Sequence, residues 1–275
     1  MKIPTFLKWA GGKRKILDEI DKHLPEKIEN YYEPFLGGSS VFFYIKQKYH
    51  PRKCVISDIN KDLINVYVDV RDRPRDLIKH LKNLKSLNSQ DFYYKVRESF
   101  NRNKSSSTKR SAIFIYLNKT CFNGLYRVNS KDEFNVPYGN HKNPEIFDEE
   151  TILFASKLLQ ETEIFCRDYE EIKEDVEKGD FVYLDPCYDP LKKTSFANYT
   201  PKRFTNDDNE RLARFVVEMH RRKVNFLLSN NVTKNVKRLY SSKDGFKRIT
   251  IRSFRSVGSK AQYRGHIPEF LIKNY

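Results

Sequence analysis

Five short apolar runs limit the folds open to this 275-residue chain more than any other feature. They alternate with segments whose apolar residues recur at helical spacing, and they lie at residues 31–33, 54–57, 164–166, 181–184 and 225–228. Strands that alternate with helices form a largely parallel sheet with helices on both faces. The sequence therefore predicts an α/β fold of the doubly wound, Rossmann-like kind.

The most clearly marked helix lies in the last third of the chain. It is predicted to begin at Thr205, where Asp208 completes an approximate capping box. Its apolar face carries Leu212, Phe215, Val216 and Met219. Residues 246–251 and 267–272 are expected to pair as antiparallel edge strands around the basic loop 256–266.

The alternation of strands and helices stops within residues 61–148. Helices are predicted there around Leu77 and within 113–117, where apolar residues recur at helical spacing or run together. We therefore expect one domain built from residues 1–60 and 149–275, with residues 61–148 inserted into it as a mainly helical second domain.

The inserted domain ends in a stretch that is predicted to be a β-hairpin. Residues 126–137 contain short extended runs on either side of the turn-prone residues 129–132. A hairpin or the end of a helix fits the major groove of DNA. This stretch is therefore a candidate for reading a nucleic acid.

The charge of the chain also favours a nucleic-acid partner. The formal net charge is +16 and the isoelectric point is about 9.5. Residues 101–131 contain seven Lys and Arg without an acid, and residues 234–264 contain ten with only Asp244 against them. If the two stretches converge, they could line a cleft for a phosphate backbone. A solvated lysine-rich surface would give the same excess without binding anything.

The cysteines indicate neither a metal site nor a disulfide framework. Cys54, Cys121, Cys166 and Cys187 lie far apart without paired spacing. Cys54 and Cys166 are interpreted as reduced core residues. The amino terminus has no apolar signal stretch, and no run is long enough to cross a bilayer. A cytoplasmic protein without a metal or a membrane partner is expected.

The tetrapeptide Asp185-Pro186-Cys187-Tyr188 is the strongest candidate for a catalytic site. It follows the apolar run 181–184. The Asp185 carboxylate and the Pro186 carbonyl can accept hydrogen bonds from an amino group, and the Tyr188 ring can stack on a flat base. The pattern fits the exocyclic amine of a nucleobase, although a buried strand that ends in an Asp-Pro turn has the same sequence signature.

A candidate cofactor site follows the first predicted strand. The two glycines in the turn 33–39 allow close approach of a ligand, and Ser39 or Ser40 is expected to cap the helix. Asp58 ends the next strand, where an acid can bind ribose hydroxyls. The chain has no complete phosphate-binding loop, which favours S-adenosylmethionine, whose cationic or aromatic parts could interact with Trp9.

Five segments then carry a resemblance to a known family. They are FLKWAGGK at 6–13, EPFLGGS at 33–39, SDIN at 57–60, FNGLYRVN at 122–129 and FNVPYG at 134–139. With the tetrapeptide they resemble, nearly end to end, the Dam-type DNA adenine-N6 methyltransferases of the alpha group. The resemblance implies a methyltransferase sheet with residues 61–148 as its target-recognition domain.

The resemblance also assigns cofactor residues. Trp9, Lys13, Asp58 and Asp185 match family positions that contact S-adenosylmethionine, and Asp168 is a further expected contact to its adenine. Phe35 and Gly37, in the turn 33–39, complete the expected cofactor site.

Residues for DNA recognition follow in the same way. Family members touch or wedge into the recognition sequence at the positions of Lys8, Phe122, Asn123, Leu125, Arg127 and Pro137. The implied target is GATC in duplex DNA. Arg127 is suited to it because a guanidinium can bond O6 and N7 of guanine together. His141 stands where a tyrosine is common in the family.

The implied chemistry is direct methyl transfer to N6 of an extruded adenine. Asp185 and the Pro186 carbonyl would hold the amine and Tyr188 would stack on the base, so no covalent enzyme intermediate and no metal are needed. Cys187 replaces the second proline of the family tetrapeptide. It restores a backbone N–H and is not assigned as a nucleophile.

Two alternatives remain at this point. The tetrapeptide would also suit an enzyme that methylates cytosine N4 or an RNA base, and a non-catalytic DNA-binding relative would keep the basic surfaces. The expected protein is a monomer of a prokaryotic or phage-type system. A companion restriction endonuclease could act in the same system without forming a stable complex.

Overall fold

The fold is built on a seven-stranded mixed sheet. The structure is a computed structural model in which residues 1–188, 205–255 and 265–275 are described. Within these residues the strand order is β3-β2-β1-β4-β5-β7-β6. The strands are β1 (Asn30–Glu33), β2 (Lys53–Asp58), β3 (Thr162–Cys166), β4 (Phe181–Leu184), β5 (Asn225–Asn231), β6 (Lys247–Arg255) and β7 (Gly265–Lys273). β1 to β5 are parallel, and β7 is antiparallel to both β5 and β6.

The strand order places a topological switch point between β1 and β4. The chain runs outward from β1 through β2 to β3 and then returns to build β4 beside β1. In doubly wound sheets the crevice at such a point, at the carboxyl ends of the strands, is where ligands bind. The turn after β1 and the tetrapeptide after β4 both begin at this switch point.

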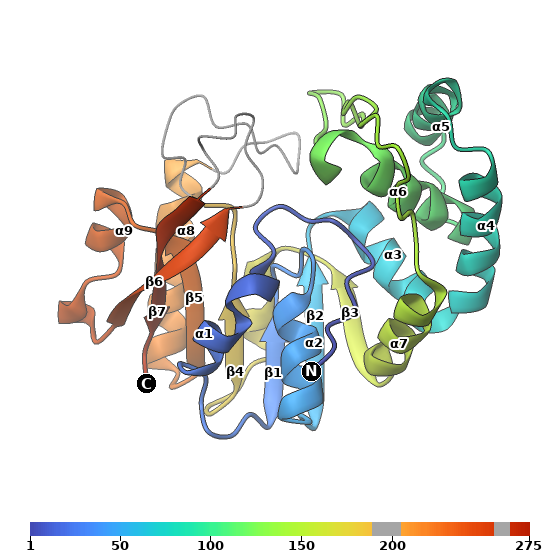
Figure 1. The fold of residues 1–275 in the computed structure, drawn as a ribbon. Helices are drawn as coiled ribbons and strands as arrows, with labels where there is room; N and C mark the ends of the chain where they lie inside the picture. Colours follow the sequence, from blue (N-terminus) through green and yellow to red (C-terminus); the bar gives the residue numbers. More distant parts are fainter. Residues whose placement is uncertain (189–204, 256–264) are drawn as a thin grey trace.

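Two hydrophobic clusters cover opposite faces of the sheet, whose strands and helices are drawn in Figure 1. Alternate residues of β4 belong to different clusters: Phe181 and Tyr183 pack with α2 (Ser40–Lys48), whereas Val182 and Leu184 pack with α8 (Asn206–Arg221). Because both faces are buried, β4 is apolar throughout, as the run 181–184 indicated.

Further helices surround the sheet. They are η1 (Lys13–Ile16), α1 (Leu17–Asp21), α3 (Lys61–Asp72), α7 (Glu149–Leu159), η3 (Tyr169–Glu174), α9 (Lys234–Leu239) and η4 (Ser242–Asp244). α3 packs against β2 and β3 on one side and against α6 (Thr108–Thr120) on the other. It therefore connects the sheet to the helical segment that follows.

That segment is a helical cluster centred on α6. α4 (Pro74–Ser86) and α5 (Gln90–Arg102) pack against α6, whose residues from Arg110 to Thr120 are all buried. The cluster lies beside the carboxyl edge of the sheet (Figure 1). A 3-10 turn, η2 (Phe122–Gly124), follows α6 directly. We propose residues 61–148 as the extent of this second domain.

The predicted strands and the capping box are confirmed. Thr205 caps α8, and its side chain and that of Asp208 bond reciprocally to each other's backbone N–H. β6 and β7 pair antiparallel as expected, but β7 lies inside the sheet between β5 and β6 and is not an edge strand. The intervening loop 256–266 lies largely outside the described residues.

Three local predictions were wrong. Ser39 takes a left-handed conformation with φ +52°, so its side chain does not cap α2; its Oγ accepts a hydrogen bond from Tyr67 instead. Cys166 is exposed because it ends β3, the strand at one side of the sheet. The stretch 126–137 forms no regular strands; a bridge between Val128 and Phe134 gives it a hairpin shape.

Candidate active site and nucleic-acid interface

An ion pair joins the tetrapeptide to the amino-terminal segment. The Lys13 ammonium donates to both carboxylate oxygens of Asp185, at 2.6 and 2.8 Å, and to the Gly11 carbonyl at 3.0 Å. The Lys13 side chain is 4% exposed and that of Asp185 is 19% exposed. Burial tends to lower the pKa of Lys13, but Asp185 and Glu269 outweigh it and raise that pKa. Lys13 is therefore a fixed positive charge beneath Asp185.

Tyr188 lies over this ion pair. Its ring centroid is 4.8 Å from Lys13 Nζ, and its hydroxyl donates a hydrogen bond to Glu269. Glu269 comes from β7, is 5% exposed, and approaches Lys13 Nζ to 3.6 Å. The structure thus brings together Lys13, Asp185 and Tyr188, three of the expected site residues, and adds Glu269, to which the sequence assigned no role.

The turn after β1 is tied to the end of β2. The Asp58 carboxylate accepts hydrogen bonds from the backbone N–H groups of Gly37, at 3.1 Å, and Asn60, at 3.0 Å. Gly37 has φ +46°, and a Cβ there would lie 2.9 Å from the Trp9 ring. A glycine is needed at this position because both its conformation and its space exclude a side chain. Trp9, Gly37 and Asp58 therefore form one unit.

The outer cofactor residues have protein partners. The Phe35 ring stacks on Tyr169 with centroids 5.0 Å apart. Asp168 caps η3, and its carboxylate binds Arg211 at 2.6 and 3.1 Å. Trp9 lies between this edge of the sheet and the helical cluster. Its ring stacks on that of Tyr126, and the two ring centroids are 5.6 Å apart.

The donor set at this edge fits S-adenosylmethionine. Asp58 is an acid at the end of a strand, where ribose hydroxyls are bound in nucleotide-binding sheets. Large apolar side chains stand exposed beside it: Ile59 is 59% exposed and Phe165, near the end of β3, is 38% exposed. An adenine ring could cover them. Neither residue was predicted to belong to the site, because the exposure of an apolar side chain is visible only in the folded chain.

The predicted DNA-contacting residues gather around η2. The Phe122 N–H donates to the Pro137 carbonyl at 2.9 Å, and a His141 ring nitrogen lies 3.3 Å from the Cys121 carbonyl. Asn118 bonds both backbone groups of Lys8, at 2.8 and 2.7 Å. The Lys8 side chain packs on Gly124, where a Cβ would lie 2.6 Å from it. The amino-terminal segment and the turn therefore form one surface.

Phe122 is the outermost residue of this turn. Its side chain is 45% exposed, and Asn123 beside it has a left-handed backbone with φ +56°. Leu125 is partly buried against the main hydrophobic cluster. An exposed ring on a tight turn has the shape of a wedge that can enter a base stack.

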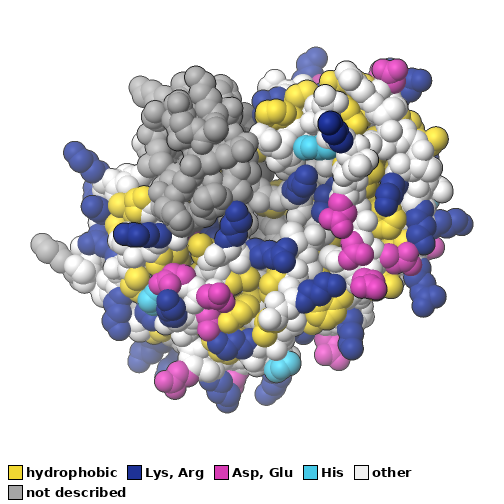
Figure 2. Space-filling model, in the orientation of Figure 1, with side chains coloured by type: hydrophobic (Ala, Val, Ile, Leu, Met, Phe, Trp, Pro, Cys, Tyr) yellow, Lys and Arg dark blue, Asp and Glu magenta, His cyan; other side chains and the backbone are white. Residues whose placement is uncertain are grey.

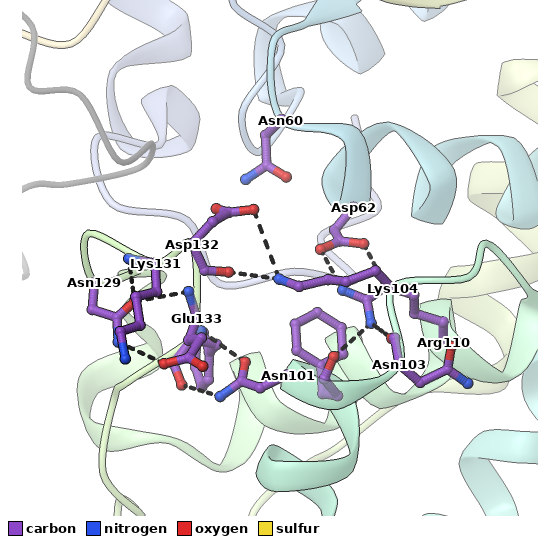
Figure 3. A network of polar contacts seen from close by, with 12 residues as sticks. Asn60, Asp62, Asn101, Asn103, Lys104, Arg110, Asn129, Lys131, Asp132 and Glu133 are labelled. Carbon is purple, nitrogen blue, oxygen red and sulfur yellow. Dashed lines mark hydrogen bonds and ion pairs between the residues drawn. The ribbon is translucent and has the colours of Figure 1, made fainter.

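Arg127 lies in the hairpin-shaped stretch 126–137. Polar contacts, such as those between Asn129 and Glu133, hold the turn of this stretch (Figure 3). Arg127 Nε donates to the Asn135 side chain at 2.7 Å. Asn101 of α5 bonds both the N–H and the carbonyl of Phe134, at 2.8 and 3.0 Å. Lys104 donates to the Asp132 carbonyl at 2.6 Å (Figure 3). The position of Arg127 therefore depends on α5.

All but two of the seven Lys and Arg side chains in the stretch 101–131 remain at least partly exposed. Arg110 is buried in a two-bond pair with Asp62, at 2.6 and 2.8 Å, and Lys119 is also buried. α9, with Lys234 and Lys237, lies on the far side of the sheet from α5 (Figure 1). Figure 2 shows Lys and Arg side chains spread over the visible face without forming one band.

No helix among residues 1–188, 205–255 and 265–275 is both long and apolar enough to span a membrane. Within the same ranges, no three His, Cys, Asp or Glu side chains are grouped so that they could hold a metal ion.

Known DNA methyltransferases are similar to this chain over most of its length. Residues 9–257 match the family described as D12 class N6 adenine-specific DNA methyltransferase. The type II methyltransferase M.MjaIII of Methanocaldococcus jannaschii is 46% identical, and the alignment covers 100% of both chains. The type II methyltransferase M1.LlaDCHI of Lactococcus lactis is 40% identical, over 98% of this chain and 95% of the relative.

A third relative is the DNA adenine methylase of Escherichia coli. It is 34% identical over 97% of this chain and 94% of its own length. The family match and these relatives all span most of the chain. The chain therefore belongs to the D12 class N6 adenine-specific DNA methyltransferase family, whose methyl donor is S-adenosylmethionine.

Proposed function

We propose that this adenine methyltransferase acts on the adenine of GATC in duplex DNA and extrudes that base before methylation. The observation that carries the proposal is the arrangement of Asp185, Tyr188 and Lys13 at the switch point, beside a turn that exposes Phe122. An adenine N6 is hidden inside a duplex, so a buried amine-binding site can reach it only if the base leaves the stack.

Asp185 and Pro186 would hold the amine. The Asp185 carboxylate and the Pro186 carbonyl accept hydrogen bonds from N6 and direct its lone pair, while Tyr188 stacks on the ring. S-adenosylmethionine supplies an electrophilic methyl group when bound. The negative charge of Asp185 stabilises the positive charge that develops on N6, and the amine needs no strong base.

The cofactor would lie along the carboxyl edge of β1 and β2. Asp58 would bind the ribose, and the hydrogen bond from the Gly37 N–H and the packing of Trp9 against Gly37 would hold the turn beside it. Lys13, Phe35 and Asp168 complete the proposed site. Asp168 would take part with its carboxylate already paired to Arg211.

DNA would lie across η2 and the stretch 126–137. Phe122 and Asn123 would fill the gap left by the extruded base, and Arg127 would read a guanine. Lys8, Leu125, Pro137 and His141 would complete this surface. Residues 61–148 would then act as the target-recognition domain.

The family match favours adenine over the two other amines that the tetrapeptide left open, cytosine N4 and an RNA base. We further propose that the protein acts as a monomer in the cytoplasm of a prokaryotic or phage-type system. A companion restriction endonuclease would act on the same sequence without a stable complex.

Replacement of Arg127 tests the proposed target. The Arg127→Ala variant should discriminate roughly 5- to 150-fold less between GATC and duplexes with a substituted guanine, which corresponds to about 1–3 kcal/mol. The measurement is kcat/KM for methyl transfer on each duplex. Arg75→Ala, on α4 away from η2, serves as the control. Unchanged discrimination in Arg127→Ala would remove this residue from recognition.

A further inference from the structure

We propose that Glu269 is a positioning residue of the methylation reaction, which orients Tyr188 directly and Asp185 through Lys13. This inference rests on the roles proposed above for Asp185 and Tyr188. It adds a residue from β7, at the far end of the chain, to a site otherwise built from the amino-terminal segment and the tetrapeptide.

Glu269 lies in the interior of the sheet. β7 pairs with both β5 and β6, and Glu269 stands opposite Asn231 and Ile251 in these two strands. A carboxylate that is 5% exposed is costly unless polar partners surround it. Its described partners, the Tyr188 hydroxyl and the Lys13 ammonium, both belong to the candidate active site.

The bond to Glu269 fixes the orientation of the Tyr188 ring. The backbone holds the Cα end of the side chain, and Glu269 holds the hydroxyl at the other end. A ring fixed at both ends forms a defined platform on which a base can stack. A tyrosine without this bond would stack equally well but in more than one orientation.

Lys13 connects Glu269 to Asp185. Its ammonium lies 2.6 Å from Asp185 Oδ1 and 3.6 Å from Glu269 Oε1, so it is held between two carboxylates. One positive and two negative charges leave this cluster with a net negative charge. The net negative charge of the cluster lies where positive charge develops on the methylated amine. Without Glu269, the net charge of the cluster would be zero.

Two substitutions at position 269 separate the two effects. Glu269→Gln keeps an oxygen that can accept from Tyr188 and removes the charge, whereas Glu269→Ala removes both. We expect kcat for adenine methylation to fall roughly tenfold in Glu269→Gln and roughly a hundredfold in Glu269→Ala. KM for DNA and the affinity for S-adenosylmethionine should change much less than kcat.

A double-mutant cycle tests the link to Tyr188. Tyr188→Phe keeps the ring and removes the hydroxyl that donates a hydrogen bond to Glu269. If Glu269 acts by holding this hydroxyl, the losses in Tyr188→Phe and Glu269→Ala should not add in the double variant. A merely structural role would lower thermal stability without this coupling in kcat.

Glu163→Gln, in β3 at the other side of the sheet, is the matched control and should keep the wild-type kcat. Wild-type kcat in Glu269→Ala, or additive losses in the double variant, would overturn the inference. If the Glu269→Ala protein does not fold, the nearly isosteric Glu269→Gln variant is used, and a wild-type kcat in that variant would overturn the inference. A wild-type protein that methylates no adenine would instead contradict the proposed function itself.

Discussion

Cys187 shows how surroundings decide the chemistry of a single residue. Burial, followed by the charges of Asp58 and Asp185, raises the pKa of its thiol to about 12. Only the thiolate is a good nucleophile, so this cysteine stays protonated and inert near neutral pH. Its position beside Pro186 therefore has no covalent role.

The first prediction follows for this tetrapeptide. Cys187→Ala should keep a rate near that of the wild type, because Asp185, the Pro186 carbonyl and Tyr188 remain. Asp185→Ala should lower kcat by about 10²- to 10³-fold, because the charge that stabilises N6 is lost. Single-turnover methylation of a duplex measures both. A folded Cys187→Ala protein that binds cofactor but transfers no methyl group would contradict this view.

Glu33 is a second residue whose surroundings alter its chemistry. It ends β1, is 3% exposed, and accepts a hydrogen bond from Tyr31 at 2.6 Å. Burial raises its pKa from 4.5 to about 8; Tyr31 opposes this shift, and Asp185 adds to it. Glu33 is therefore protonated in the folded protein at neutral pH and ionised in the unfolded chain.

A pH-dependent stability follows. Between pH 4.5 and about 8 the folded state holds one proton more at Glu33 than the unfolded state, so the free energy of unfolding falls as pH rises. Glu33→Gln replaces the carboxyl with an amide, which neither gains nor loses a proton in this pH range. Its stability relative to the wild type should increase across that range, by at most about 5 kcal/mol. Urea unfolding at several pH values measures it, and parallel curves for the two proteins would refute it.

At the scale of elements, the stretch 126–137 depends on α5 more than on its own pairing. The two bonds from Asn101 to the backbone of Phe134 replace those of a neighbouring strand (Figure 3). Arg127 is carried by the same stretch. Loosening α5 should therefore affect recognition of the DNA sequence.

Asn101→Leu removes both bonds and should destabilise this stretch by roughly 1–3 kcal/mol. We expect faster amide hydrogen exchange at Phe134 and weaker discrimination against duplexes with a substituted guanine. Asn83→Leu, at an exposed position of α4, is the control. Unchanged exchange at Phe134 in Asn101→Leu would show that the stretch is held by other contacts.

Local signals predicted the elements well. Apolar runs located β1 to β5, and the pair Thr205 and Asp208 located the start of α8. Ser39 misled because capping by a side chain needs an extended backbone, whereas Ser39 takes φ +52°. This left-handed backbone conformation depends on the whole turn, so it could not be predicted from the presence of a serine at position 39.

Long-range contacts could not be predicted in this way. The bond between Tyr188 and Glu269 joins residues 81 positions apart, and the Lys13–Asp185 pair joins residues 172 apart. The resemblance pointed to Lys13 and Asp185, whereas the contacts of Glu269 with the site became visible only once β7 lay inside the sheet. The pairing of Arg110 in the basic stretch 101–131 with Asp62 is likewise a long-range contact that counting charges along the chain does not reveal.

At the scale of the whole molecule, the switch point and η2 stand at the same edge. Lys8 connects them, because its segment continues through Trp9 to Lys13 while its backbone is bonded to Asn118 of α6. A base extruded at Phe122, as proposed, would therefore leave the duplex on the side of the molecule that carries Asp185. Site recognition and methyl transfer are therefore expected to occur together.

The most direct test is methyl transfer from isotope-labelled S-adenosylmethionine to matched duplexes with intact or scrambled GATC, followed by identification of the modified base. We expect N6-methyladenine in the intact duplex alone. Equal transfer to both duplexes would contradict the proposed target. No transfer, although DNA and cofactor both bind, would contradict the central claim that Asp185, Pro186 and Tyr188 form a working amine site.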